Sequence, residues 1–235
     1  MLAIRSLVFV TLFYLWSVFW VLLIIPLVVF PRRWIIRSWR YWALGIFFLL
    51  KVICGIRVEL RGQQHIPKGH GLIAPKHQCM LDVFAQFAWL PDSCFVTKKE
   101  LMWIPFFGWY AYKGRMIEVD RSAQAAALRK MVADAKNRFA DERQLVIFPE
   151  GTRGAPGVPG DYKPGIAALY RELDVAVTPM ATNAGVHWPA HGFLRHPGTI
   201  VYEYLPSIPP GLKRAEFMRI LQERIETASM ALLPL

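Results

Sequence analysis

The feature that most constrains the fold of this chain is a run of 24 residues without a charge, Leu7–Phe30. About 20 apolar residues suffice to cross the hydrocarbon core of a bilayer, and this run is apolar around its whole circumference, unlike the one-sided helix of a soluble core. A secretory signal peptide would have an apolar stretch of only ~7–15 residues before a small-residue cleavage site. Because the run ends in Pro31, Arg32 and Arg33 instead, we predict an uncleaved membrane anchor.

The charges around this run predict its orientation. Arg5 precedes it, and four arginines follow it: Arg32, Arg33, Arg37 and Arg40. Cytoplasmic flanks carry the excess of cations, so we expect the chain after the anchor to lie in the cytoplasm. A second apolar stretch, Tyr41–Leu50, is short and close to the charge of Lys51. Two arrangements therefore remain open: a single crossing, or a two-helix hairpin that lies in one leaflet.

The composition narrows the class of protein and of partner. The 235 residues are 54% hydrophobic and 19% charged, which excludes intrinsic disorder because disorder requires low hydrophobicity and high charge. The net charge of +11 favours phosphate-bearing partners. In a chain this apolar, we expect those phosphates to belong to a membrane rather than to nucleic acid. Three cysteines with no C-x-x-C pair predict free thiols, with neither a disulfide scaffold nor a zinc site.

Residues 57–235 have the pattern of a globular α/β domain that follows a membrane anchor over residues 1–56. Seven short β-rich runs are predicted as strands: Ile56–Leu60, Gly71–Ala74, Cys94–Thr97, Met116–Val119, Leu145–Phe148, Val175–Met180 and Thr199–Tyr204. Helical patterns between and after them begin at Ser122, a possible N-cap, at Pro164 and at Lys213. This alternation predicts an α/β fold with a mixed, largely parallel sheet flanked by helices, preceded by a membrane-anchoring helix pair.

The first group of residues with chemical potential is His77 and Asp82, which follow a predicted strand and open a helix-like segment. At this spacing the carboxylate can accept a hydrogen bond from one imidazole nitrogen and leave the other free to take a proton. This is the base and orienting half of a catalytic triad. No serine, threonine or cysteine stands in a nucleophile-elbow setting, so we expect the nucleophile to be a hydroxyl of the substrate.

Three further segments suggest a ligand site at the ends of strands. The block Phe148–Arg153 follows an apolar run, and ligands bind at strand ends in α/β folds, where arginine suits phosphate. The stretch Leu101–Trp109 has too many aromatic residues for a loop unless it contacts a membrane or an acyl chain. Five cations near strand ends either share one phosphate pocket or form a solvated basic face: Lys98, Lys99, Arg115, Arg121 and Lys163.

Together these blocks resemble the glycerolipid acyltransferase family. Its first block, H-x4-D, matches His77 and Asp82, and its third, F-P-E-G-T-R, matches Phe148–Arg153 without a change. The second and fourth blocks match Met116–Arg121 and Val175–Pro179, and the segments between them also match: Lys98–Leu101, Ile104–Gly108 and Tyr162–Gly165. One position departs from the family pattern, because Arg115 stands where many members have glycine.

The resemblance implies acyl transfer from acyl-CoA or acyl-carrier protein to the sn-2 hydroxyl of lysophosphatidic acid, which gives phosphatidic acid. It implies that His77 is the general base and that Asp82 orients and stabilises its imidazole, with no metal and no cofactor. The expected location is the inner (cytoplasmic) membrane of a bacterium, with the catalytic domain facing the cytoplasm.

The same resemblance assigns substrate binding to six residues: Lys98, Arg121, Glu150, Gly151, Thr152 and Arg153. Lys98 and Arg153 are expected on the acceptor phosphate. Arg121 would add to that pocket or hold Glu150, and Glu150 would position the glycerol or the arginine cluster. Gly151 would allow close approach of the backbone.

Alternatives remain at this point. A related acyltransferase acting on lyso-ornithine lipid or glycerol-3-phosphate would share the blocks. A non-catalytic membrane protein that binds anionic lipid or nucleic acid would explain the charge and the anchor, but not the two blocks together. A metal hydrolase would use His187 and His191 with Asp82, although Pro189 between the two histidines disrupts a helical pair.

Overall fold

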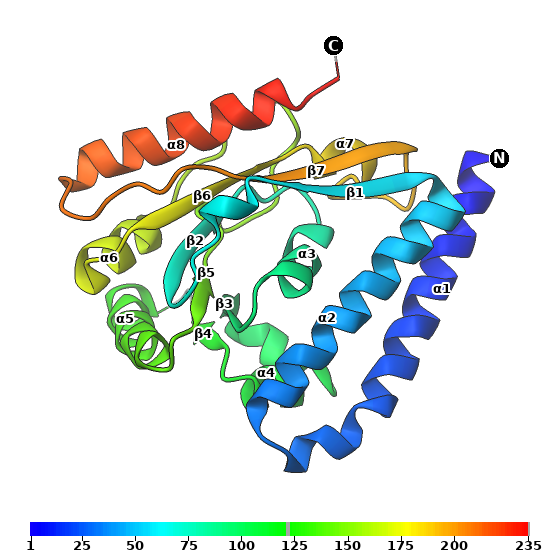
Figure 1. Cartoon of the computed structure of the whole chain (residues 1–235), viewed down its shortest axis with the longest axis horizontal. Coiled ribbons are helices and arrows are strands. Elements are labelled where there is room, and N and C mark those ends of the chain that lie inside the picture. The colour runs from blue at the N-terminus through cyan, green and yellow to red at the C-terminus, as the bar shows by residue number, and fades with distance from the viewer. Residues whose placement is uncertain (121–122, 235) are drawn as a thin grey trace.

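A computed structural model describes residues 1–120 and 123–234, and within these ranges seven strands form one sheet in the order β1-β7-β6-β2-β5-β3-β4 (Figure 1). The strands are β1 Ile56–Arg61, β2 Gly71–Pro75, β3 Ser93–Lys98, β4 Ile117–Val119, β5 Gln144–Val146, β6 Val177–Thr182 and β7 Gly198–Tyr204. The seven predicted strands are confirmed, with ends that differ by one or two residues. The predicted strand to Phe148 ends at Val146, because the next residues turn away toward Pro149, which has no N–H for a ladder.

The sheet is mixed and largely parallel, as predicted. Strands β6, β2, β5, β3 and β4 run in one direction, whereas β7 is antiparallel to β6 and β1 is parallel to β7. The carboxyl ends of the five parallel strands therefore meet at one edge of the sheet, and the segments that follow them are brought together there.

The helices are α1 Leu2–Leu23, α2 Arg32–Leu49, α3 Leu81–Trp89, α4 Phe107–Lys113, α5 Gln124–Ala140, α6 Pro164–Leu173, α7 Ala184–His187 and α8 Arg214–Ala231. Helix α3 lies on one face of the sheet, and α5 and α6 lie on the other (Figure 1). The helices predicted after Pro164 and Lys213 are confirmed. Ser122, the predicted cap of α5, lies outside the described residues.

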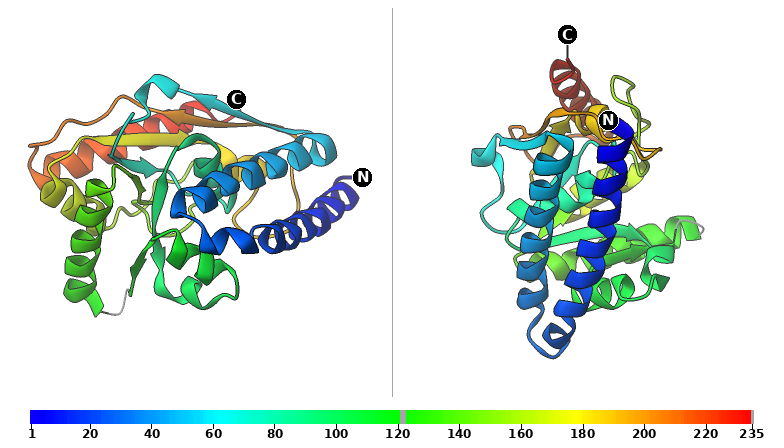
Figure 2. Two further views of the ribbon diagram at one scale, coloured as in Figure 1. Left: turned by 60° about the horizontal axis from the view of Figure 1, so that its bottom comes forward. Right: turned by 90° about the vertical axis from the view of Figure 1, so that its right-hand side faces the viewer.

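The N-terminal segment is a helical hairpin that lies against the domain (Figures 1 and 2). Helices α1 and α2 are joined by the turn Ile25–Val29. Buried Phe9 and Phe13 of α1 pack edge-on against Trp188, and Phe13 also stacks on Phe84 of α3. The predicted helix pair is thus confirmed, and α1 is the one described helix long and apolar enough to span a membrane.

A large apolar surface is exposed on α1 and on the segment around α4. The outward face of α1 includes Leu7, Leu15 and Phe19, each more than half exposed. We call the second part the apolar platform, and it consists of Trp103, Ile104, Phe106, Phe107, Trp109 and Tyr112. This surface includes most of the stretch Leu101–Trp109, whose predicted contact with a membrane or an acyl chain stays a prediction.

Candidate active site

His77 and Asp82 meet where β2 turns into α3. The strand ends at Pro75 and the helix begins at Leu81, so the five-residue spacing is bridged by a short turn. The Nδ1 atom of His77 lies 3.1 Å from Oδ2 of Asp82. The side chain of Asp82 is fully buried, whereas that of His77 is 13% exposed. The pair thus has a buried carboxylate and an imidazole that reaches the surface.

Four groups besides His77 surround the Asp82 carboxylate. Oδ2 accepts hydrogen bonds from the backbone N–H groups of Gln78 (2.5 Å) and Cys79 (2.7 Å). Oδ1 accepts from the hydroxyl of Tyr202 at 3.0 Å, and the thiol of Cys79 lies 3.5 Å away. Asp82 also lies in the first turn of α3, where the helix dipole favours an anion. These donors hold the carboxylate in one orientation.

The partners of His77 determine what its ring can do. With Nδ1–H donating to Asp82, Nε2 carries the lone pair and is the atom able to take a proton. The imidazole ring stacks on Phe148, with centroids 4.1 Å apart and planes inclined by 27°. The carboxylate and the phenyl ring together hold the imidazole in one orientation.

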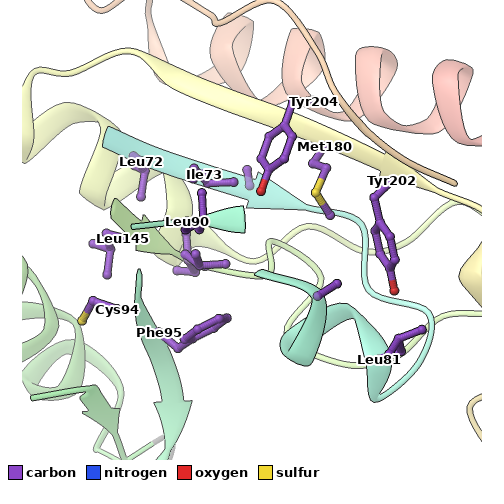
Figure 3. Close-up of a cluster of buried hydrophobic side chains, with 14 of the residues drawn as sticks. Leu72, Ile73, Leu81, Leu90, Cys94, Phe95, Leu145, Met180, Tyr202 and Tyr204 are labelled. Atoms are coloured by element: carbon purple, nitrogen blue, oxygen red, sulfur yellow. The ribbon is translucent and has the colours of Figure 1, made fainter. Parts of the chain in front are cut away.

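Tyr202 is a site residue that the sequence analysis missed. It comes from β7, 120 residues after Asp82, and Figure 3 shows its hydroxyl pointing toward the start of α3 near Leu81. Burial, with the nearby Asp82 carboxylate as a second cause, raises the pKa of the Tyr202 hydroxyl well above its usual value. The hydroxyl therefore remains protonated and donates. Only its place in an apolar strand is visible in the sequence, and that does not distinguish it from a core tyrosine.

The Phe148–Arg153 block lies beside His77. It follows β5, the neighbour of β2, and the backbone N–H of Gly154 donates to the carbonyl of His77 at 2.8 Å. Gly151 has a φ of +64° and its N–H donates to the Phe148 carbonyl at 3.0 Å. A tight turn with this φ favours a residue without Cβ.

The predicted phosphate-binding cations reach the same edge of the sheet. Thr152 and Arg153 are exposed, and the Arg153 guanidinium donates to the carbonyl of Ala190 at 3.3 Å. Lys98 ends β3, which is parallel to β5, and is also exposed. Arg121 lies outside the described residues.

Glu150 differs from the expectation. Its side chain is 2% exposed and lies 3.0 Å from the ammonium of Lys76, which also contacts both oxygens of Glu226 on α8 at 2.8 Å. A Cβ at Gly160 would meet the Glu150 side chain at 2.5 Å, so the loop also packs tightly over it. Burial raises the pKa of Glu150, and the nearby Glu226 carboxylate adds to this rise, whereas Lys76 opposes it. Glu150 therefore braces the interior of its loop, and among the described residues its ion-pair partner is a lysine and not an arginine.

Four of the five cations near strand ends lie in the described part of the chain, and these four do not all share one pocket. Arg115 precedes β4, at the edge opposite to Lys98, and pairs with Asp141 at 3.5 Å. Lys99 pairs with Asp120 at 3.3 Å, and Lys163 pairs with Asp161. Within the described ranges, no three His, Cys, Asp or Glu side chains lie close enough together to hold a metal ion, so nothing there supports the alternative of a metal hydrolase. All three cysteines are buried and free, as predicted.

The model of the acyltransferase family matches residues 57–183, and the chain belongs to this family. Among curated proteins it is similar to the 1-acyl-sn-glycerol-3-phosphate acyltransferase of Pseudomonas aeruginosa, 34% identical over 168 residues, which are 72% of this chain and 64% of that protein. The enzyme of that name from Limnanthes alba is 31% identical over 66% of this chain and 55% of its own. The chain thus spans less than two thirds of these relatives.

Among solved structures, the chain is similar to the 1-acyl-sn-glycerophosphate (LPA) acyltransferase PlsC of Thermotoga maritima. The TM-score is 0.81 and the match covers 99% of both chains at 19% identity. This likeness establishes the fold, including the N-terminal helix pair.

Proposed function

We propose that the protein transfers an acyl group from acyl-CoA or acyl-carrier protein to the sn-2 hydroxyl of 1-acyl-sn-glycerol-3-phosphate, which gives phosphatidic acid. The observation that carries the proposal is the His77–Asp82 pair. Nδ1 of His77 lies 3.1 Å from Oδ2 of Asp82, which leaves Nε2 free to take a proton. The pair lies directly beside the Phe148–Arg153 block. The printed names of the relatives support the choice of acceptor.

The proposed reaction uses an imidazole as base and the acceptor hydroxyl as nucleophile. Nε2 of His77 takes the hydroxyl proton as the oxygen attacks the thioester carbonyl, and Asp82 stabilises the imidazolium that forms. Collapse of the tetrahedral intermediate forms the ester, breaks the carbon–sulfur bond and releases the thiolate. The imidazolium returns its proton to the sulfur, so the enzyme ends as it began. General-base catalysis of this kind contributes about 10²–10⁴-fold.

The acceptor phosphate is assigned to Arg153 and Lys98, with Thr152 beside them. Both cations are exposed on the edge that carries His77, and arginine pairs with phosphate through two parallel hydrogen bonds. Glu150 and Gly151 act indirectly in this proposal. Glu150 holds the interior of the loop through its ion pair with Lys76, and Gly151 allows the turn of the loop.

We also propose that residues 1–56 attach the acyltransferase domain to the cytoplasmic face of a bacterial inner membrane. The packing of Phe9 and Phe13 against the domain favours the hairpin in one leaflet over a single crossing, because a helix that crossed the bilayer would leave these contacts. The exposed apolar residues of α1 and of the apolar platform would then face the acyl chains.

An acceptor panel tests the function. The purified full chain is incubated with labelled acyl-CoA or acyl-carrier protein and, separately, with lysophosphatidic acid, glycerol-3-phosphate or lyso-ornithine lipid. We expect labelled phosphatidic acid from lysophosphatidic acid, at a rate at least tenfold above the other acceptors. Preference for another acceptor would reassign the substrate, and no transfer to any of the three would contradict the proposed activity.

A further inference from the structure

A basic cavity of about 880 Å³ lies at the edge of the sheet opposite to His77. It opens between the start of α2, helix α4, strand β4 and helix α5. Its lining consists of Pro31, Arg32, Arg33, Met102, Tyr112, Lys113, Arg115, Met116, Glu118, Lys130, Asp134 and Arg138. Strands β2 and β4 run in the same direction. Arg115 and Met116 lie before the start of β4, whereas His77 lies after the end of β2. The cavity is therefore separate from the candidate active site.

The charges in this cavity are strongly unbalanced. Six cations and two carboxylates line it, and both carboxylates are already paired with Lys130, at 3.5 Å for Glu118 and 3.0 Å for Asp134. Three of the cations, Arg33, Lys113 and Arg138, have no carboxylate partner within the described part of the chain. Concave surfaces lined by one sign of charge concentrate the opposite ion, so the cavity suits an anion.

Arg115 contributes its cation to the cavity from an uncommon backbone conformation. Its φ is +51°, in the left-handed region that side chains with a Cβ rarely occupy. The carbonyl of Arg115 is held there by hydrogen bonds from Arg138 Nε at 2.8 Å and from fully buried Arg143 Nη1 at 3.1 Å. A glycine would adopt this conformation without strain. Backbone strain of this kind is typical of functional positions. Compared with a glycine at this position, the arginine adds a positive charge to the cavity.

The rim of the cavity is apolar and exposed. Val29, which is 84% exposed, and Phe30 come directly before the lining residue Pro31 in the chain. Trp103, which is 79% exposed, comes directly after the lining residue Met102. Figure 2 shows the tip of the hairpin beside α4, and the hydroxyl of Tyr110 joins the two by donating to the Val21 carbonyl at 2.8 Å. Basic lining thus meets the surface assigned to the acyl chains of a membrane.

We propose that this cavity binds the phosphate headgroup of an anionic phospholipid, whose acyl chains lie over the exposed residues of the hairpin tip and the apolar platform. The inference rests on the proposed attachment to a membrane. It assigns a second lipid site, distinct from that of the acceptor, on the opposite edge of the sheet.

The test compares two sets of variants in the full chain, purified in neutral detergent. The cavity set is Arg115→Gly alone and the triple variant Arg33→Gln, Lys113→Gln, Arg115→Gly. The matched control removes three exposed cations of α6 and α8: Arg171→Gln, Arg214→Gln and Arg219→Gln. The rise in melting temperature gives an apparent Kd for four probes: phosphatidylglycerol, phosphatidylcholine, inorganic phosphate and CoA.

Each cation near an anionic lipid surface strengthens binding about fivefold. We therefore expect Arg115→Gly to weaken phosphatidylglycerol binding about fivefold and the cavity triple about 100-fold, with no change in the control triple and little binding of phosphatidylcholine by any protein. Without lipid, Arg115→Gly should melt at the same temperature as the parent or higher, since it relieves the backbone.

Two results would overturn the inference. Equal loss in the cavity triple and the control triple would mean that only net charge matters. Tighter binding of CoA or inorganic phosphate than of phosphatidylglycerol would mean that the cavity takes a soluble phosphate. Acyl transfer measured on the parent protein is independent of both outcomes, so failure of the proposed reaction is distinguishable from failure of this site.

Discussion

Replacing Lys76 by methionine tests the buried charge cluster beneath the candidate active site. Lys76 is 1% exposed and is paired with Glu150 at 3.0 Å and Glu226 at 2.8 Å. Its loss leaves two adjacent carboxylates without a cation, and removing one partner of a buried ion pair costs about 3–5 kcal/mol. For a chain of this size each kcal/mol lowers Tm by about 2–4 °C. We therefore expect a fall of about 6–20 °C at pH 7.5.

The pH dependence identifies the cause of this loss. Burial already raises the pKa of Glu150, and removing Lys76 raises it further. A carboxyl group whose pKa is higher in the folded than in the unfolded protein destabilises the fold when it ionises. The free energy of unfolding therefore falls as the pH rises from the unfolded pKa to the folded pKa. The difference in Tm between the parent and Lys76→Met should therefore be small near pH 4 and largest above neutrality.

Thermal melts from pH 4 to 8 make the measurement, with exposed Lys68→Met as the matched control and Lys76→Met, Glu226→Gln as the compensating pair. The double variant should recover part of the stability because one of the two stranded charges is gone. A Lys76→Met protein that melts within 2 °C of the parent at every pH would refute the reasoning.

Three further outcomes follow from the site. Tyr202→Phe removes a buried hydrogen bond to the Asp82 carboxylate, which costs about 1.5–3 kcal/mol, so melts should show a Tm lowered by several degrees and kinetics a reduced kcat with unchanged KM. Burial and the Asp82 carboxylate raise the pKa of the Cys79 thiol, so mass spectrometry should find it unmodified by iodoacetamide in the native protein and modified in urea. Arg153→Ala should raise the KM for lysophosphatidic acid roughly 10- to 150-fold, more than Arg153→Lys does, while the thioester KM moves little; an unchanged acceptor KM would remove Arg153 from the phosphate.

The strands and the pairing of His77 with Asp82 were predictable because both depend largely on local sequence. The buried run at β2 is followed by a short turn that brings His77 and Asp82 together over five residues. The end of β5 was less predictable, since the sequence shows an apolar run to Phe148 but not the turn that the Gly151 backbone makes.

The remaining parts depend on contacts between distant segments. Lys76 and Glu226 are 150 residues apart, and nothing in their local sequence distinguishes them from surface charges. Without that contact, Glu150 was assigned to the substrate. Arg115 was visible as a departure from the family pattern, but its left-handed backbone and the two arginines that hold its carbonyl are tertiary features.

The central claim is that His77, oriented by Asp82, is the base in acyl transfer to lysophosphatidic acid. Its most direct test is the turnover of purified His77→Ala at saturating thioester and acceptor, with a melt to confirm the fold. The account predicts a kcat at least 100-fold below the parent and a Tm within a few degrees of it. Turnover near that of the parent in the folded variant would contradict the account.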